Sequence, residues 1–280
     1  MKNESLVKME MNAEIVVDVR KLNYKSGNRY LLKNINWQVK RGENWILFGL
    51  NGCGKTTLLS IVAGYKGFLD GSVQVFGESY TNQNILQHRN RIAWISSSFF
   101  DRYYTSESVL NIVLSGLSGT FGLPYQVTAN DVQKAKKLLK SLRIEQYCNY
   151  HYNRLSKGER QNVLIARALM HDAELFILDE PCSGLDVNAR DRMLQYIRSL
   201  AKNPEITVIY VTHYAEEISE EFEHAILMRN GRIVQQGNTA ELFSSESMQA
   251  FLECDVQCSW QNGRLHMQFA ADEEGRWICE

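Results

Sequence analysis

Short runs rich in apolar and β-branched residues are the first regular pattern along the chain. Two such runs, residues 14–20 and 35–40, are separated by a turn signal at Gly27-Asn28. Runs joined by a turn are typical of antiparallel strands. A third run, residues 45–48, is apolar throughout, which predicts a buried strand. The pattern therefore predicts an antiparallel β region followed by a core strand.

Helical and extended patterns follow each other in the next part of the chain. Residues 55–63 have a helical pattern that ends before Gly64 and Gly67, and residues 72–76 and 92–95 read as strands. Between residues 99 and 155 no strand pattern occurs, so we expect a helical insertion there.

An amphipathic helix is the strongest signal within this insertion. Residues 131–142 carry apolar side chains at helical spacing. Beyond residue 160 the alternation returns, with strands at 175–178 and 206–211 on either side of a further helix at residues 187–200. Its apolar positions are Val187, Met193, Leu194, Ile197 and Leu200. Such alternation implies a parallel sheet covered by helices.

The last part of the chain contains two hairpin signals, Asn230-Gly231 and Asn262-Gly263, each between short apolar runs. The second follows a helix-start signal at Phe243. We therefore expect a main domain over residues 14–243, with a helical subdomain at about 99–165, and a C-terminal extension over residues 244–280. The extension is interpreted as regulation, a dimer brace or a cap on the fold.

Composition limits the classes of function. Basic and acidic residues nearly cancel, at 31 and 32, so we expect no direct nucleic-acid binding. The N-terminal segment carries charges and lacks the apolar core of a signal peptide. No run approaches the roughly 18 apolar residues of a membrane-spanning helix. Six irregularly spaced cysteines favour reduced thiols, which together with these features predicts a cytoplasmic protein.

The most specific motif is Gly49-Leu-Asn-Gly-Cys-Gly-Lys55-Thr56, which follows the predicted strand at residues 45–48. Its glycines let backbone N–H groups surround phosphates, Lys55 supplies a positive charge to the β- and γ-phosphates, and the Thr56 hydroxyl is a ligand for Mg²⁺. The helix that follows directs its positive end at the same anion. The motif predicts a nucleotide site.

Acidic residues follow the predicted strand at residues 175–178. Asp179 is expected to bind Mg²⁺ or its waters, and Glu180 to polarise the water that attacks the γ-phosphate. A surface turn before Pro181 is the alternative. His213 follows the next strand at the same predicted edge, where ligands of open α/β sheets bind, so we expect it to contact the γ-phosphate.

A helix start at Ser156 is the remaining clue. Ser156 and Glu159 fit a capping box, which explains the pattern structurally. The alternative is that this helix N-terminus binds a phosphate.

Taken in order, the motifs GLNGCGKTT, LSKGE, LFILDEP, SGLD and a strand ending in THY resemble the ATP-binding cassette (ABC) family of ATPases over roughly residues 14–243. The resemblance implies an α/β fold in which a P-loop NTPase parallel sheet carries an antiparallel β subdomain and an α-helical insertion. It implies that Lys55, Glu180 and His213 are catalytic and that Thr56 and Asp179 bind Mg²⁺. It implies that Tyr24 binds ATP by stacking on adenine. The other ATP-binding residues that it implies are Asn51, Gly52, Cys53, Gly54, Lys55, Thr56, Thr57, Ser156, Gly158 and Glu159.

The resemblance also implies partners. A head-to-tail homodimer or heterodimer of such subunits would sandwich two ATP molecules, each between the phosphate loop of one subunit and the Ser156–Gly158 region of the other. Separate transmembrane permease subunits would hold the dimer at the cytoplasmic face of the membrane. The alternative function is a soluble ATPase switch acting on a cytosolic protein or nucleic-acid machine.

The chain departs from the family pattern at three positions. Lys157 and Glu159 stand where the signature LSGGQ has Gly and Gln, and Ser97 stands at about the place of a Gln that normally contacts Mg²⁺ or the attacking water. Ser97 is too short to reach as that Gln does. We expect either a bridging water or altered coupling to the partner at this point.

Overall fold

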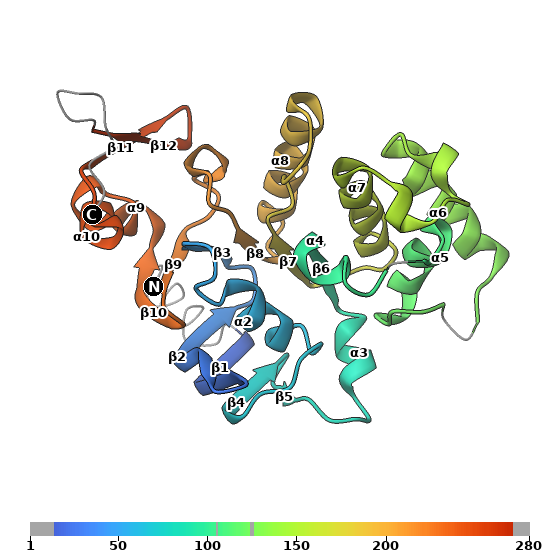
Figure 1. The fold of residues 1–280 in the computed structure, drawn as a ribbon, viewed down its shortest axis with the longest axis horizontal. Helices are drawn as coiled ribbons and strands as arrows, with labels where there is room; N and C mark the ends of the chain where they lie inside the picture. The colour runs from blue at the N-terminus through green and yellow to red at the C-terminus, as the bar shows by residue number, and fades with distance from the viewer. Residues whose placement is uncertain (1–13, 105, 124–125, 271–280) are drawn as a thin grey trace, which may run out of the picture.

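The core of the molecule is a six-stranded sheet (Figure 1). The computed structural model describes residues 14–104, 106–123 and 126–270. The strand order is β10-β9-β3-β8-β7-β6, and all neighbours run parallel except the β9–β10 hairpin. The strands are β3 (Asn44–Gly49), β6 (Ile92–Ser96), β7 (Leu175–Asp179), β8 (Thr207–Val211), β9 (His224–Arg229) and β10 (Arg232–Asn238).

The apolar character of three of these strands fits their central position in the sheet. Every residue of β3, β7 and β8 is buried, as expected for strands covered on both faces by other elements. Helix α7 (Lys157–Ala168) packs against β6, and helix α8 (Val187–Ala201) packs against β8. Parallel strands end at one edge of the sheet, so the loops after β3, β7 and β8 meet there.

An antiparallel sheet of order β2-β1-β4-β5 lies beside this core. It consists of β1 (Ile15–Ser26), β2 (Arg29–Lys40), β4 (Asp70–Val75) and β5 (Glu78–Ser79). β1 and β2 are longer than the sequence pattern predicted, because they pair through several register irregularities that interrupt the apolar alternation. Helix α2 (Lys55–Val62) follows β3 of the six-stranded sheet and contacts β2 and β4 of the antiparallel sheet, so it connects the two. The short helix α3 (Ile85–Arg89) leads into β6.

The segment between β6 and β7 is helical, as predicted, and lies at one end of the molecule (Figure 1). Before α7 it contains α4 (Ser97–Phe100), α5 (Val109–Leu114), η1 (Ser115–Ser118), α6 (Ala129–Ser141), η2 (Glu145–Tyr147) and η3 (Tyr152–Arg154). The buried Arg167 on α7 joins this insertion to the core. Its guanidinium donates to the Ser115 hydroxyl at 3.1 Å and to the Tyr65 hydroxyl at 3.1 Å.

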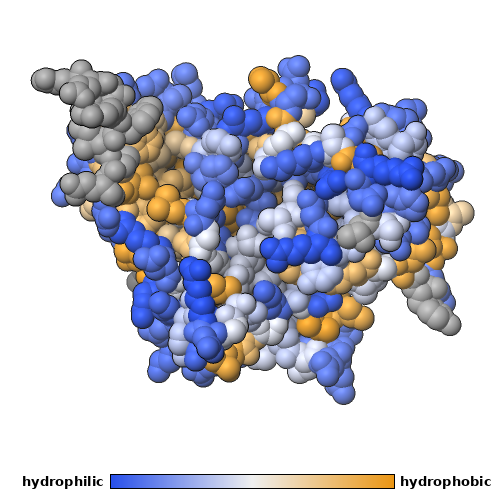
Figure 2. Space-filling model, viewed as in Figure 1, coloured by the Kyte–Doolittle hydropathy of each residue, from blue (hydrophilic) through white to orange (hydrophobic). Residues whose placement is uncertain are grey.

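The C-terminal elements are α9 (Thr239–Leu242), α10 (Ser245–Leu252), β11 (Val256–Gln261) and β12 (Arg264–Phe269), and both predicted hairpins are present. β12 packs on η4 (Ala215–Glu217), the turn that follows His213. The Leu265 N–H donates to the Ile218 carbonyl at 3.0 Å. Figure 2 shows apolar residues gathered in a hollow beside α9 and α10. This hollow of about 370 Å³ is lined by residues that include Phe48, Leu252 and Met267.

Two expectations are wrong in detail. Val187, an apolar position of the predicted helix at residues 187–200, is 84% exposed, because it lies in the first turn of α8 rather than on its buried face. Cys254 is disulfide-bonded, which irregular spacing did not reveal, whereas Cys53, Cys148, Cys182 and Cys258 are free thiols.

The N-terminal segment judged above and residues 271–280 of the extension lie outside the described residues. Within the described ranges, no helix combines the length and apolar character needed to cross a membrane.

Candidate functional site

The loop between β3 and α2 follows a path that only glycine allows at two points. A side chain at Gly49 would place its Cβ 2.3 Å from the Met228 carbonyl oxygen. At Gly54, φ is +111° and a Cβ would lie 2.8 Å from the Leu31 carbonyl oxygen. The glycines therefore let the loop press against β9 and β2 while turning into the helix. A loop of this kind, followed at once by a helix N-terminus, is a binding site for phosphate.

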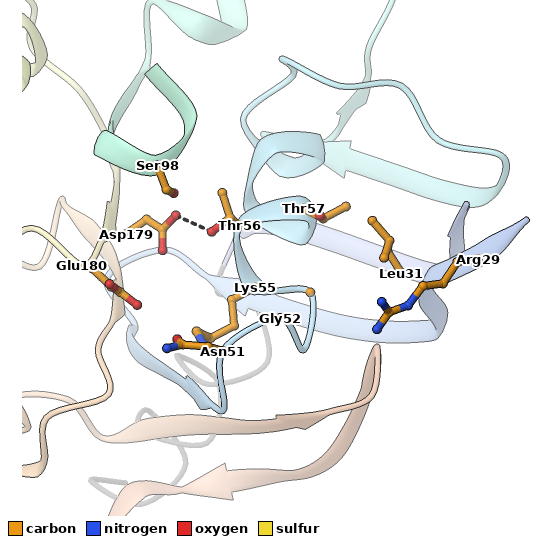
Figure 3. Close-up of a pocket in the computed structure, with 11 residues that line it drawn as sticks. Arg29, Leu31, Asn51, Gly52, Lys55, Thr56, Thr57, Ser98, Asp179 and Glu180 are labelled. Carbon is orange, nitrogen blue, oxygen red and sulfur yellow. Dashed lines mark hydrogen bonds between the residues drawn. The ribbon is translucent and has the colours of Figure 1, made fainter. Parts of the chain in front are cut away.

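Lys55 is the first residue of α2, and its side chain lies inside the loop. It is 6% exposed, and its Nζ donates to the Gly49 carbonyl at 2.6 Å and to the Leu50 carbonyl at 3.2 Å. Figure 3 shows its side chain extending back across the loop toward Asn51. The carbonyls therefore hold a positive charge inside the curve of the loop, where an anionic ligand would lie.

Asp179 closes the opposite side of the site at the end of β7. The Thr56 hydroxyl and the Ser96 hydroxyl each donate to its Oδ2 at 2.8 Å (Figure 3 shows the Thr56 bond). Burial raises the pKa of Asp179 above its usual value, while the hydrogen bonds from Ser96 and Thr56 act in the opposite direction. Hydroxyl and carboxylate oxygens of three separate segments thus meet at one point.

Glu180 and His213 form a pair beside this point. His213 Nδ1 lies 3.1 Å from Glu180 Oε1, and both side chains are about a third exposed, at 35% and 32%. The Glu180 backbone is in the left-handed region, with φ +52°, and its N–H donates to the Val211 carbonyl at 3.0 Å. Such a conformation is costly for a residue other than glycine, and it aims the carboxylate toward the pocket in Figure 3.

Lys55, Thr56, Asp179 and Glu180 line one open pocket of about 480 Å³, whereas His213 lines the neighbouring hollow of about 370 Å³. The lining residues of the 480 Å³ pocket are Arg29, Leu31, Asn51, Gly52, Gly54, Lys55, Thr56, Thr57, Ser98, Asp179 and Glu180. The sequence analysis missed Arg29, Leu31 and Ser98. Ser98 lies beside the position where a Gln was noted as missing, which was a usable signal. Arg29 and Leu31 carried no signal, because their place follows from the pairing of β2 with β1.

Two of the expected ligand residues are placed differently. Tyr24 is not among the lining residues, and Lys66 Nζ lies 4.8 Å from the centroid of its ring. The Cys53 side chain is only 6% exposed, and burial raises the pKa of its thiol. The Cys53 thiol therefore faces the core, because a side chain on the inner curve of the loop would occupy the phosphate space.

Ser156, Gly158 and Glu159 lie in a second hollow of about 470 Å³, which shares no lining residue with the first. Both the backbone N–H and the hydroxyl of Ser156 donate to Glu159 Oε2 at 2.8 Å, and the N–H bond is the main cause of the lowered pKa of Glu159. The capping box is therefore present. One chain does not bring Ser156 to the phosphate loop.

The signature segment contacts the segment after β7. Lys157 Nζ donates to the Ser183 hydroxyl at 2.8 Å, and its aliphatic stem covers Gly184. A Cβ at Gly158 would lie 2.9 Å from the Gly184 carbonyl oxygen. The Lys that departs from the family pattern is thus accommodated by a hydrogen bond to a neighbouring loop.

Ser97 does not face the pocket. Its hydroxyl donates to Gln161 Oε1 on α7, whereas the next residue, Ser98, is the one that lines the pocket. Of the two serines, Ser98 and not Ser97 therefore lies at the pocket. The reason is that β6 ends at Ser96 and α4 begins at Ser97, which turns successive side chains in different directions.

A glycine-cradled loop, a lysine inside it and paired acids at the end of a neighbouring parallel strand define a P-loop nucleotide-binding protein. The comparisons with known proteins agree. The family described as ABC transporter matches residues 32–183. YlmA, an uncharacterized ABC transporter ATP-binding protein of Bacillus subtilis, is 35% identical over 252 residues, which cover 89% of this chain and 96% of that protein.

Further relatives extend this likeness. The spermidine/putrescine import ATP-binding protein PotA of Thermotoga maritima is 33% identical over 217 residues, covering 77% of this chain and 56% of that protein. Among solved structures, cbiO1 of Clostridium perfringens, part of the ABC transporter complex cbiONQ, is 26% identical with a TM-score of 0.64, covering 84% of this chain and 93% of that one. A dimeric ATP-binding cassette bound to ADP and phosphate shares the fold, at 24% identity and a TM-score of 0.67, covering 79% and 98%.

The chain belongs to the ABC transporter family, as an ATP-binding subunit that hydrolyses ATP. The predicted α/β fold class is confirmed. The relatives support the transporter subunit and give no support to the alternative of a soluble switch.

Proposed function

We propose that the 480 Å³ pocket binds the ATP phosphates together with Mg²⁺. The observation that carries this proposal is the meeting of the Thr56 hydroxyl with Asp179 Oδ2, 2.8 Å apart, next to the Glu180–His213 pair. Hydroxyl and carboxylate oxygens are the ligands that Mg²⁺ prefers, so the donor set fits this ion. Mg²⁺ bound there by Thr56 and Asp179 would neutralise charge on the phosphates.

Each residue of the site then has its own role in the reaction. Asn51 to Thr57 hold the phosphates, with Lys55 placing its charge against the β and γ oxygens. Glu180 Oε1 and Oε2 orient a water and accept its proton as it attacks the γ-phosphate. His213, held against Glu180, contacts the γ-phosphate and keeps the carboxylate aligned. Adenine stacks on the ring of Tyr24 in this proposal, and Lys66 Nζ lies 4.8 Å from the centroid of that ring.

The complete site is composite in this proposal. The two hollows of one chain share no lining residue, so Ser156, Gly158 and Glu159 are available to a second subunit's nucleotide. The dimeric cassette that shares the fold supports this arrangement. A homodimer or a heterodimer with a similar subunit satisfies the geometry. ATP then favours the closed dimer, and hydrolysis reopens it.

We further assign the output of this cycle to separate permease subunits. Relatives such as PotA carry import in their names, and cbiO1 is part of a transporter complex. The subunit would then lie on the cytoplasmic face of the membrane. Residues 14–243 would form the ATPase unit, with the helical subdomain at about 99–165, and residues 244–280 the extension.

The test uses Glu180→Gln, which keeps the size of the side chain but removes its ability to accept the proton. With Mg²⁺-ATP, this variant should bind nucleotide normally, hydrolyse it at least about a hundredfold more slowly, and elute as a dimer in size-exclusion chromatography with light scattering. Wild-type protein with ADP is the monomeric control. Unchanged turnover would refute the role of Glu180, and a monomer under all conditions would refute the composite site.

A further inference from the structure

Glu217 is a buried carboxylate that the reaction described above does not use. Its side chain is 2% exposed and lies in η4, on the segment that follows His213. Burying a carboxylate costs free energy unless hydrogen-bond donors satisfy it. The donors that bind Glu217 therefore indicate which parts of the structure it connects. The residue lies outside the part of the chain that the family comparison matches.

The partners come from β8, from the segment directly after it and from α8. Glu217 Oε2 accepts hydrogen bonds from the Tyr210 hydroxyl on β8, at 2.7 Å, and from the Thr212 hydroxyl. Glu217 Oε1 accepts from Arg190 Nε on α8 at 2.9 Å. Only a carboxylate offers acceptor sites to all three donors at once, because an amide would turn an N–H group toward one of them.

These bonds fix the backbone on both sides of His213. The Thr212 hydroxyl, bound to Glu217, also accepts from the Tyr214 N–H at 3.0 Å. The ring of Tyr214 lies against His213, with centroids 4.1 Å apart, and the Arg190 guanidinium lies 5.1 Å from the Tyr214 centroid. Glu217 and Arg190 therefore clamp the residues that precede and follow the histidine.

Arg190 connects this clamp to the segment that touches the signature region. The backbone N–H of Arg190 donates to the Asp186 carbonyl at 2.8 Å in the first turn of α8, and Asp186 caps the N-terminus of that helix. The Ser183–Asp186 turn directly before α8 contacts Lys157 and Gly158. A movement of the Ser183–Asp186 turn would therefore be transmitted to His213 through Arg190 and Glu217.

The C-terminal hairpin holds the outer side of the same segment. The Leu265 N–H donates to the Ile218 carbonyl at 3.0 Å, and the Glu220 N–H donates to the Gly263 carbonyl at 3.1 Å. The backbone on both sides of Glu217 is thus bound, by β8 before it and by the hairpin after it. The C-terminal hairpin therefore holds the segment that carries the Glu217 carboxylate.

We propose that Glu217 is a positioning residue for hydrolysis: through Thr212 and Arg190 it holds His213 against Glu180 and links that pair to the Ser183–Asp186 turn. This inference rests on the proposed function of Glu180 and His213. It adds that α8 sets the alignment of the pair and that the C-terminal hairpin supports it.

Three single variants in the full chain test the proposal. Glu217→Gln keeps an oxygen for the two hydroxyls but sets an amide against Arg190, and Arg190→Met removes the same bond from the other side. Both should lower kcat about fivefold, as expected for loss of one hydrogen bond that orients a reacting group, with KM for ATP unchanged because β3 and its loop are untouched. The control, Arg198→Met on the same helix, should leave both constants unchanged.

A second readout separates positioning from mere stabilisation. In nitrogen-15 histidine NMR spectra without nucleotide, the His213 ring signals should shift in Glu217→Gln and Arg190→Met but not in Arg198→Met. If wild-type protein hydrolyses ATP while both variants keep wild-type kcat and His213 signals, this inference is wrong and the proposed function stands. If wild-type protein hydrolyses no ATP, the proposed function itself fails.

Discussion

Two adjacent serines, Ser97 and Ser98, occupy the segment that lacks the Gln of the family pattern, and replacing them tests which one contributes to the site. Ser98 lines the nucleotide pocket, and its hydroxyl lies 3.2 Å from that of Ser96, which in turn donates to Asp179. Ser97 donates instead to Gln161, a fully buried amide on α7. Replacing each serine by alanine removes one hydroxyl from the same short helix, so the two variants are matched in chemistry and differ only in direction.

The geometry gives opposite expectations for the two variants. Ser98→Ala loses a hydroxyl that can reach a metal-bound water, worth about 1 kcal/mol or about fivefold in Mg²⁺ affinity, with little loss of stability. Ser97→Ala leaves Gln161 buried without its oxygen partner, in addition to an Nε2 that already has none within the described residues. That should cost about 1–3 kcal/mol and lower Tm by about 2–8 °C, with Mg²⁺ affinity unchanged.

The assays are Mn²⁺ binding by electron paramagnetic resonance in the presence of ADP, and thermal unfolding by circular dichroism without nucleotide. Ser98→Thr, which keeps the hydroxyl, is the control and should bind Mn²⁺ as the wild type does. The reasoning fails if Ser97→Ala weakens Mn²⁺ binding as much as Ser98→Ala, or if Ser98→Ala is the variant that lowers Tm.

Three further predictions follow from single contacts. The Cβ added by Gly158→Ala would lie 2.9 Å from the Gly184 carbonyl oxygen. This variant should have a lower kcat in a steady-state ATPase assay, whereas the affinity of the single subunit for ATP, measured by calorimetry, should be unchanged. A maleimide should label the half-buried Cys148 in the native protein but reach the buried Cys53 only after denaturation, as mass spectrometry can show. The Arg91 hydrogen bond is the main cause of the lowered pKa of Glu174, so the ionised carboxylate stabilises the fold above its unfolded pKa near 4.5. Urea unfolding should therefore find Glu174→Gln less stable than wild type by about 1 kcal/mol at pH 7, with the difference vanishing as the pH falls through the folded pKa.

Local patterns in the sequence were sufficient for most of the fold. The apolar runs that became β3, β7 and β8 are buried along their whole length, so composition alone identified them. The Asn230-Gly231 and Asn262-Gly263 turns identified both hairpins. Where prediction fell short, as in the extra length of β1 and β2, the cause is pairing between strands, which no window of the sequence contains.

The same division applies to the site. Lys55, Thr56, Asp179 and Glu180 were predictable because spacing along the chain and the edge of a parallel sheet determine where they meet. The directions of individual side chains were not. Whether Ser97 or Ser98 faces the pocket depends on a strand ending one residue earlier, and the inward-facing thiol of Cys53 depends on the curve of the loop.

Glu217 shows why long-range positioning is the hardest part to foresee. Its residue type, following THYAE in a polar stretch, suggests an exposed acid, yet its side chain is only 2% exposed. Its surroundings come from distant parts of the chain, because Arg190, 27 residues earlier, donates to it and the hairpin near Leu265 binds the adjacent Ile218. The charge is tolerated only because three donors converge on it, and the same three donors immobilise the backbone around His213. In our proposal, the hydrogen bonds that satisfy this buried acid are also the bonds that hold the histidine beside Glu180.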